Sequence, residues 1–197
     1  MGKSTCALLL ERLGLPIIDT DQVARDVVAP GQPALAEIRD AFGPDVLAPG
    51  GVLDRARVAA LVFGDPQARA RLEGILHPRI RSIWQSRVVD WRREGRPGGA
   101  VIIPLLFETA AEPAFDKVLC VACSGATQRQ RLRERGWTDD QIAGRLAAQL
   151  PIEAKILRSD FLVWTETSLT VHEAQLRRVL STVGVVMPAT SASSSPP

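Results

Sequence analysis

The sequence lacks the long apolar run that a membrane span would need. No stretch approaches the ~20 consecutive apolar residues of a transmembrane helix, and the N-terminus has no basic region followed by an apolar stretch and a cleavage site. We therefore expect a cytoplasmic protein without a membrane partner. A strong charge bias is missing too, because 24 Lys and Arg residues stand against 22 Asp and Glu residues. A net charge of +2 does not suggest a nucleic-acid binder.

Cysteine is scarce, and its placement argues against metal or redox chemistry. The sequence contains only Cys6, Cys120 and Cys123. The last two have the CxxC spacing of a zinc or redox pair, but they lie in the apolar stretch KVLCVAC. No second pair exists, and His77 and His172 lie far away in the sequence. We favour the interpretation that both cysteines are small buried residues of a strand.

The remaining pattern predicts an α/β fold. With 46% hydrophobic residues, the 197-residue chain can bury the core of one domain. Strand-type apolar runs separated by helical patterns cover residues 15–19, 100–108, 117–123 and 161–165. These runs are continuous rather than alternating, which indicates a parallel sheet that is covered on both faces. Residues 21–95 are predicted to be a block of helices without a strand, so we expect a helical insertion in an α/β core.

Local signals refine this helical block and the C-terminal end. Thr20 or Asp21 is predicted to cap a helix. His77-Pro78 is predicted to end one helix and to open the next. The low-complexity end predicts a disordered tail over residues 187–197, after a single domain over residues 1–186.

The chain opens on Gly-Lys-Ser-Thr, the second half of the phosphate-binding loop G-x-x-x-x-G-K-[ST]. In that loop backbone N–H groups surround the phosphates, the lysine reaches the outer phosphates, and the hydroxyl binds Mg²⁺. A convincing helix follows, as the pattern requires, but four residues alone are a weak signal. The first glycine and the preceding strand are not in this sequence. We hypothesise that the natural chain begins about a dozen residues earlier, given the usual strand length.

Several stretches in the same order resemble the dephospho-coenzyme A kinase family of P-loop kinases. The similar strings are GKST, LGLPIIDTDQVARDVVAPGQPAL, the His77-Pro78 pair, IPLLFE, TQRQRLRERG and RLAAQLPIEAKILRSDFLV. The resemblance covers about residues 2–180. It implies a P-loop NTPase-type parallel sheet flanked by helices, with an acceptor-binding helical insertion over about residues 27–95 and a helical lid over about residues 124–150.

The resemblance also implies a reaction. ATP, with Mg²⁺, would phosphorylate the 3′-hydroxyl of dephospho-coenzyme A, a small-molecule substrate, in the last step of coenzyme A synthesis. The residues implied to bind ATP are Gly2, Lys3, Ser4, Thr5, Arg131 and Arg135, with Ser4 as the Mg²⁺ ligand. Arg131 and Arg135 are predicted to share a helix face, four residues apart. Arg145 matches a lid position, although a salt bridge is an equal alternative.

Acceptor residues follow from the same resemblance. They are Asp19, Arg25, His77, Leu105, Phe107 and Glu108, with Leu106 beside them. Asp21 is expected to be the catalytic base, and Lys3 and Arg135 are expected to stabilise the transferred phosphoryl group. For Asp21 the alternative is a role as a plain helix cap. For His77 the alternative is a structural role at a helix junction.

The sequence departs from the family pattern at two places. Ile102 stands where many members carry an acid, and Trp164-Thr165 stands where an acid and an asparagine are common, so the resemblance assigns no adenine contacts. Two other functions stay open. A truncated protein would bind coenzyme A-like ligands without turnover, whereas another small P-loop kinase would act on a nucleoside monophosphate or a small alcohol. The sequence sets no oligomeric state.

Overall fold

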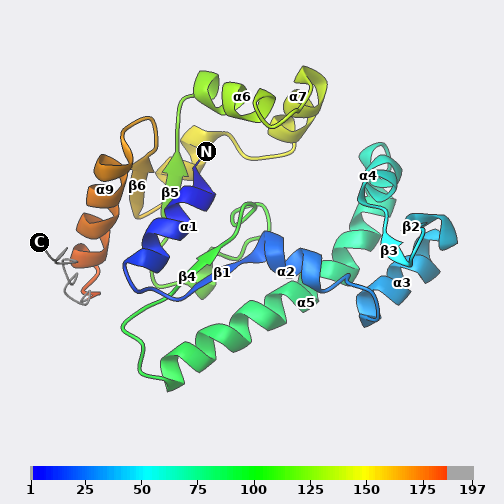
Figure 1. Ribbon diagram of the computed structural model, residues 1–197, viewed down its shortest axis with the longest axis horizontal. Coiled ribbons are helices and arrows are strands. Elements are labelled where there is room, and N and C mark those ends of the chain that lie inside the picture. The colour runs from blue at the N-terminus through cyan, green and yellow to red at the C-terminus, as the bar shows by residue number, and fades with distance from the viewer. Residues whose placement is uncertain (1, 186–197) are drawn as a thin grey trace, which may run out of the picture. The chain divides into compact units, whose positions relative to one another are not determined.

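The computed structural model describes residues 2–185 (Figure 1). The chain divides into two compact units, Met1–Ile17 with Pro97–Pro197 and Ile18–Arg96, and the boundary falls inside the first strand. The predicted tail over residues 187–197 lies outside the described residues.

The first unit has the α/β character that the sequence predicts. Its strands are β1 (Ile17–Asp19, at the boundary), β4 (Ala100–Ile102), β5 (Leu119–Ala122) and β6 (Phe161–Trp164). Its helices are α1 (Lys3–Arg12), α6 (Gly125–Arg133), α7 (Asp139–Ala147), α8 (Ile152–Leu157) and α9 (Leu169–Thr182), with the short 3₁₀ helix η2 (Glu112–Ala114).

The strands of this unit form two separate pairs. β5 runs parallel to β6, with Leu119 opposite Phe161 and Ala122 opposite Trp164. β4 pairs with β1. The strand expected over residues 100–108 is wrong in length, because β4 ends at Ile102 and residues 104–110 form turns. Pro104 has no N–H to continue a ladder of backbone hydrogen bonds, so the apolar run beyond it folds locally.

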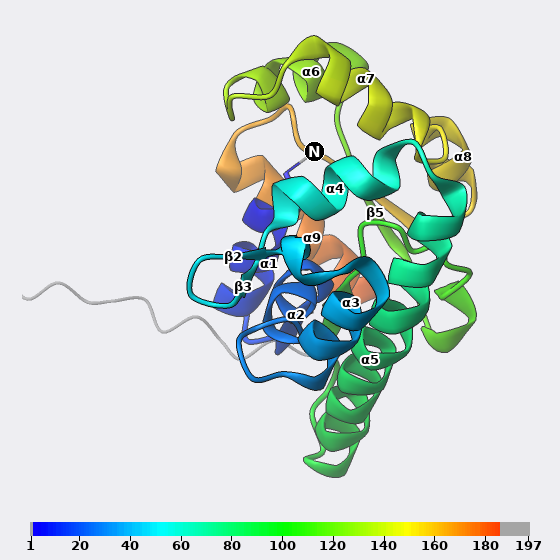
Figure 2. The same ribbon diagram turned by 90° about the vertical axis from the view of Figure 1, so that its right-hand side faces the viewer.

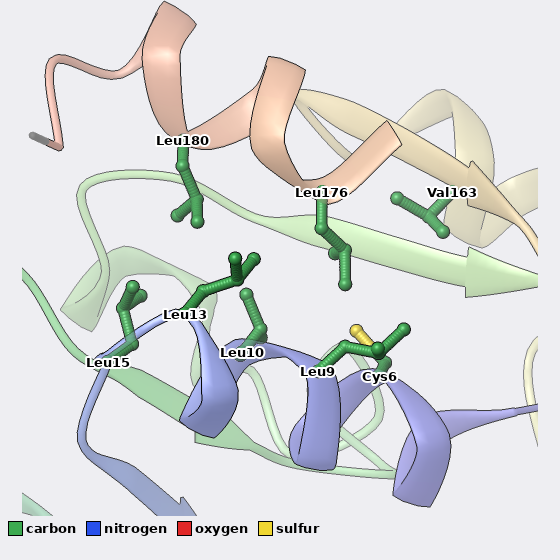
Figure 3. Close-up of a cluster of buried hydrophobic side chains, with 8 residues drawn as sticks. All are labelled: Cys6, Leu9, Leu10, Leu13, Leu15, Val163, Leu176 and Leu180. Atoms are coloured by element: carbon green, nitrogen blue, oxygen red, sulfur yellow. The ribbon is translucent and has the colours of Figure 1, made fainter. Parts of the chain in front are cut away.

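The core of the first unit lies between α1, α9 and β6. Leu9 and Leu10 of α1, with Leu13 at its C-cap, face Leu176 and Leu180 of α9 (Figure 3). These leucines recur on one face of α1 at the spacing of an amphipathic helix, which is why the sequence predicts this helix well.

All three cysteines are free and buried, as the apolar run KVLCVAC predicts for Cys120 and Cys123. Cys6 belongs to the leucine core, and burial raises the pKa of its thiol to about 12. A thiol held in its neutral form is a poor nucleophile and a poor metal ligand. The structure therefore supports the packing interpretation of these residues.

The second unit is mainly helical. Its elements are α2 (Thr20–Asp26), α3 (Pro33–Phe42), the 3₁₀ helix η1 (Pro44–Val46), β2 (Leu47–Ala48), β3 (Val52–Leu53), α4 (Arg55–Phe63) and α5 (Pro66–Arg93). In Figure 2, α3 lies against α5. Ile38 of α3 and Val46 are completely buried in the core of this unit.

The prediction that residues 21–95 contain no strand is wrong, because this unit contains one small β-hairpin. β2 and β3 pair in antiparallel fashion, with Leu47 opposite Leu53 and Ala48 opposite Val52. Gly50 and Gly51 have φ angles of 90° and 75°, in the left-handed region that glycine adopts at little cost. Strands of two residues are too short to show an apolar period in a sequence.

The prediction of a helix break at His77-Pro78 is also wrong. α5 runs without interruption from Pro66 to Arg93, with Pro78 inside it. A proline removes one backbone hydrogen bond and crowds the carbonyl four residues earlier, which here belongs to Gly74, a residue without a side chain. α5 also packs on α2, α3 and α4, and these contacts help to hold the helix through the proline.

In residues 2–185 no helix combines the length and the apolar character that crossing a membrane requires.

Candidate active site

The phosphate-binding signature lies at the start of α1. Gly2 is the N-cap with φ 77°, and Lys3, Ser4 and Thr5 form the first turn, where the Gly2 carbonyl accepts from the Cys6 N–H at 2.9 Å. The first N–H groups of a helix have no partner within the helix, and the helix dipole adds positive potential there. The exposed Ser4 and the half-buried Lys3 therefore lie where an anionic group is favoured.

Thr165 brings the loop after β6 against this turn. A Cβ atom built on Gly2 would lie 2.9 Å from Thr165 Cγ2, so both the space and the positive φ require glycine at this position. Thr165 itself is buried and accepts two hydrogen bonds from Arg131: Nη1 donates to its Oγ1 at 2.9 Å and Nη2 to its carbonyl at 2.7 Å. Thr165 thus joins Arg131 to the phosphate-binding turn.

Glu166 holds the same loop to the start of α6. Its carboxylate accepts from the Ser124 hydroxyl, from the Ser124 N–H at 3.1 Å, and from Trp164 Nε1 at 3.0 Å. Hydrogen bonds from Ser124 and Thr127 lower the pKa of Glu166 to about 2. Sequence reasoning missed Glu166 and the bridging role of Thr165, since both depend on contacts between residues far apart in the chain.

Arg135 is not placed as predicted. α6 ends at Arg133, so Arg135 lies beyond its C-cap and does not share a helix face with Arg131. Gly136, with φ 82°, ends the helical path at this point. Arg145 lies over the Trp137 ring at 4.9 Å from its centroid, a cation–π contact rather than the salt bridge that was its alternative.

Two basic residues contact the segment IPLLFE: Lys155 of α8 and Arg158 at the C-cap of that helix. Lys155 Nζ lies 2.8 Å from Glu108 Oε1, and both side chains are largely buried, at 8% and 17% exposure. Arg158 pairs with Glu112 and lies 4.5 Å from the centroid of the Phe107 ring. Phe107 is buried, whereas Leu105 is exposed.

The charge on Glu108 is well stabilised. Burial raises the pKa of this carboxyl, but hydrogen bonds from Lys155 and from the Leu150 N–H, at 2.9 Å, outweigh that effect and leave the pKa below its ordinary value. Leu150 follows α7, so Glu108 ties the end of that helix to IPLLFE and α8. No local pattern indicates a role for Lys155, because its partner lies 47 positions earlier in the chain.

The remaining candidates belong to the second unit. Asp19 is the N-cap of α2, and its Oδ1 accepts from the Asp21 N–H at 2.8 Å, so the cap predicted at Thr20 or Asp21 is wrong by one or two residues. Asp21 is exposed in the first turn. Arg25 donates to Gln22 Oε1 at 3.0 and 2.6 Å, and His77 is an exposed residue of α5.

This cap gives a stability prediction. Replacing Asp19 by Ala should lower the free energy of unfolding by about 1 kcal/mol, because the Asp21 N–H loses its acceptor. Asp19→Asn should stay within about 0.3 kcal/mol of the parent, since asparagine caps helices as well as aspartate does. Urea unfolding measures both variants. Equal losses would show that the charge, and not the cap, is what matters.

His172 gives a prediction for pH. It is buried on α9, and Nε2 has no hydrogen-bond partner among residues 2–185. Burial and the nearby Arg131 lower the pKa of His172. Below about pH 6.5 the unfolded chain binds a proton that the folded chain does not, so stability should fall from pH 7 to pH 5.5, by at most about 1.4 kcal/mol per pH unit. Thermal unfolding of His172→Leu should lose this slope; an unchanged slope would contradict the assignment.

Residues 2–185 contain no cluster of three or more His, Cys, Asp or Glu side chains that could hold a metal ion.

Comparisons with known proteins show the family to which this chain is similar. The sequence model of the family described as Dephospho-CoA kinase matches residues 1–170. The Dephospho-CoA kinase of Anaeromyxobacter dehalogenans is 45% identical over 82% of this chain and 77% of its own length, and that of Moorella thermoacetica is 44% identical over 89% and 84%.

Solved structures agree on the fold. The structure titled TT1252 from Thermus thermophilus has a TM-score of 0.76 at 31% identity and covers 92% of this chain and 91% of its own. Dephospho-CoA kinase from Campylobacter jejuni has a TM-score of 0.68 at 24% identity, with the same coverage, and supports the fold alone. Because the family pattern spans most of the chain and these relatives are similar over most of their lengths, the chain belongs to the dephospho-CoA kinase family.

Proposed function

We propose that this chain transfers the γ-phosphoryl group of ATP to the 3′-hydroxyl of dephospho-coenzyme A and so produces coenzyme A and ADP. Its membership of the dephospho-CoA kinase family supports this reaction, the last step of coenzyme A synthesis. The observation that carries the proposal is the bridge through Thr165, which touches Gly2 and binds Arg131. It joins an arginine to a helix start that favours phosphate.

The phosphate-binding turn and the segment after β5 would serve ATP. In our proposal Lys3 contacts the β- and γ-phosphates, while Gly2 and Thr5 shape the turn around them. Arg131 and Arg135 neutralise charge on the transferred group, because phosphoryl transfer depends on positioning and on charge stabilisation. Arg131 would be placed by Thr165, whereas Arg135 would act from the turn after α6. Mg²⁺, bound through Ser4, would supply additional positive charge.

The acceptor would be activated by Asp21. A carboxylate within hydrogen-bond reach of the 3′-hydroxyl can take its proton as the oxygen attacks. Asp19 would orient this region through its cap on α2, and Arg25 would bind a phosphate of the acceptor. His77 would contact the acceptor nucleotide.

In the first unit, the IPLLFE segment would also contact the acceptor. Leu105 and Phe107 would pack on the acceptor, and Glu108 would hold the segment in place. We also propose that residues 27–95 form the acceptor-binding insertion, that residues 124–150 form the lid, and that the enzyme works in the cytoplasm.

An ADP-release assay tests the proposed reaction. The chain, with ATP and Mg²⁺, should release ADP when dephospho-coenzyme A is added. Release should be at least about 100-fold slower with AMP or a small alcohol, because a site that binds its acceptor through polar groups rejects an analogue that lacks the matching groups. The assay is run on the 197-residue chain and on a version extended upstream by a strand and a glycine loop. If neither form turns over dephospho-coenzyme A, the proposed reaction is wrong.

A further inference from the structure

Helix α6 has no apolar side chain that anchors it in the core. None of its nine residues is buried, so packing in the core of the first unit does not set how the helix is rotated about its axis. The contact of Arg133 with Asp139, at 2.8 Å, stays within residues 124–150 and does not fasten α6 to the core. The direction in which α6 presents Arg131 therefore depends on polar contacts with the rest of the unit.

The loop after β6 makes two such contacts. Glu166 accepts from the hydroxyl and from the N–H of Ser124, the N-cap of α6, and Thr165 accepts from Arg131 further along the helix. Ser124 and Arg131 are seven positions apart, close to two helical turns, so they lie on the same face of α6. Attachment at two points of one face fixes both the position of the helix and its rotation.

A carboxylate suits the first of these two attachment points. Oε1 of Glu166 accepts from Ser124, and Oε2 accepts from Trp164 Nε1 at 3.0 Å, so both oxygens are used. With a pKa of about 2 the group is charged at neutral pH. Its negative charge lies at the start of α6, where the helix dipole is positive. A glutamine would turn its own N–H groups toward one of these donors and could not hold both.

We propose that Glu166 is a positioning residue, which holds Ser124, sets the rotation of α6 and so directs Arg131 toward the phosphate-binding turn. The bonds to Thr165 use two of the five N–H groups of the guanidinium, so Arg131 can bind Thr165 and a phosphate oxygen together. Glu166 acts through Arg131 and not on the substrate. Its effect on the rate rests on the proposed function, whereas its effect on the Arg131 side chain does not.

A double-mutant cycle in the ADP-release assay tests whether Glu166 acts through Arg131. Glu166→Ala should lower kcat at least about tenfold and leave KM for dephospho-coenzyme A within about threefold, because a small displacement of a positioned group slows the reaction. The double variant with Arg131→Met should have the kcat of Arg131→Met alone, since the group that Glu166 positions is then absent. A double variant that loses the product of the two single effects would overturn the proposal.

The Arg131 side chain gives a second measurement, which needs no substrate. In nuclear magnetic resonance spectra of the full chain, its Nη hydrogens should exchange with solvent at least about fivefold faster in Glu166→Ala than in the parent. The matched control is Glu173→Gln, which removes another carboxylate of the first unit, paired with Arg177 at 2.7 Å, and should change this exchange and kcat less than about twofold.

The two measurements distinguish this proposal from the proposed function. Unchanged exchange at Arg131 in Glu166→Ala would overturn the positioning role, whatever the activity of the parent. Faster exchange in Glu166→Ala, with a parent that does not phosphorylate dephospho-coenzyme A, would support the positioning of Arg131 and contradict only the proposed function.

Discussion

Replacing Asp21 by Asn is expected to lower kcat for dephospho-coenzyme A phosphorylation by about 10²- to 10⁴-fold, the usual contribution of a general base. The amide has the same size as the carboxylate but cannot accept the hydroxyl proton. The Asp21 side chain makes no capping bond, because the cap of α2 is Asp19. Folding should therefore be unaffected, and KM for the acceptor should change little. Steady-state kinetics and thermal unfolding separate the two effects.

Asp26→Asn is the matched control for this variant. Asp26 is also an exposed aspartate of α2, and its carboxylate accepts from Gln22 Nε2 at 2.7 Å. Its removal should leave kcat within about twofold, since exposed polar contacts contribute little. If Asp21→Asn keeps more than about a tenth of the parent kcat, Asp21 is not the base.

Replacing Lys155 by Met is expected to cost about 3–5 kcal/mol of unfolding free energy, the usual loss when one partner of a buried ion pair is removed. Glu108 would then keep its largely buried charge and its hydrogen bond from the Leu150 N–H, at 2.9 Å, but would lose its ion-pair partner. Methionine matches the lysine stem in length, so lost packing should contribute little. Urea unfolding measures the change.

Two further variants decide why Lys155→Met is destabilised. Lys155→Met with Glu108→Gln should recover about half of the loss, because the glutamine is neutral and its carbonyl can still accept from Leu150. Lys117→Met removes an exposed ion pair with Asp160, at 56% and 36% exposure, and should cost less than about 1 kcal/mol. If the double variant is no more stable than the single one, the unpaired charge is not the cause.

The sequence predicts best the features that depend on neighbouring residues. The leucines of α1 repeat at the helix period, and the β5 and β6 runs are apolar throughout, so these elements and the α/β fold were predicted correctly. The early end of β4 and the uninterrupted course of α5 were not predicted. Each pattern contains a proline, and the sequence alone does not show that β4 stops before Pro104 whereas α5 continues through Pro78. In the first case proline ends a ladder of hydrogen bonds, whereas in the second tertiary packing outweighs its cost.

Among the candidate-site residues too, those in a local motif were found from the sequence and those that depend on distant partners were not. Gly2 to Thr5 were found from a local motif, and the structure places them at the start of α1 as expected. Thr165, Glu166 and Lys155 could not be found, since each acts through a partner more than 30 positions away in the chain. Long-range contacts of this kind leave no period in the sequence.

Direct detection of the product tests the central claim. The chain and its upstream extension are incubated with Mg²⁺, dephospho-coenzyme A and ATP labelled in the γ-phosphoryl group, and the acceptor is analysed by mass spectrometry. The proposed function predicts an acceptor that carries one labelled phosphate on its 3′-oxygen, formed at least about 100-fold more slowly when Lys3 is replaced by Met. ATP hydrolysis without a labelled acceptor, or equal rates for Lys3→Met and the parent, would contradict it.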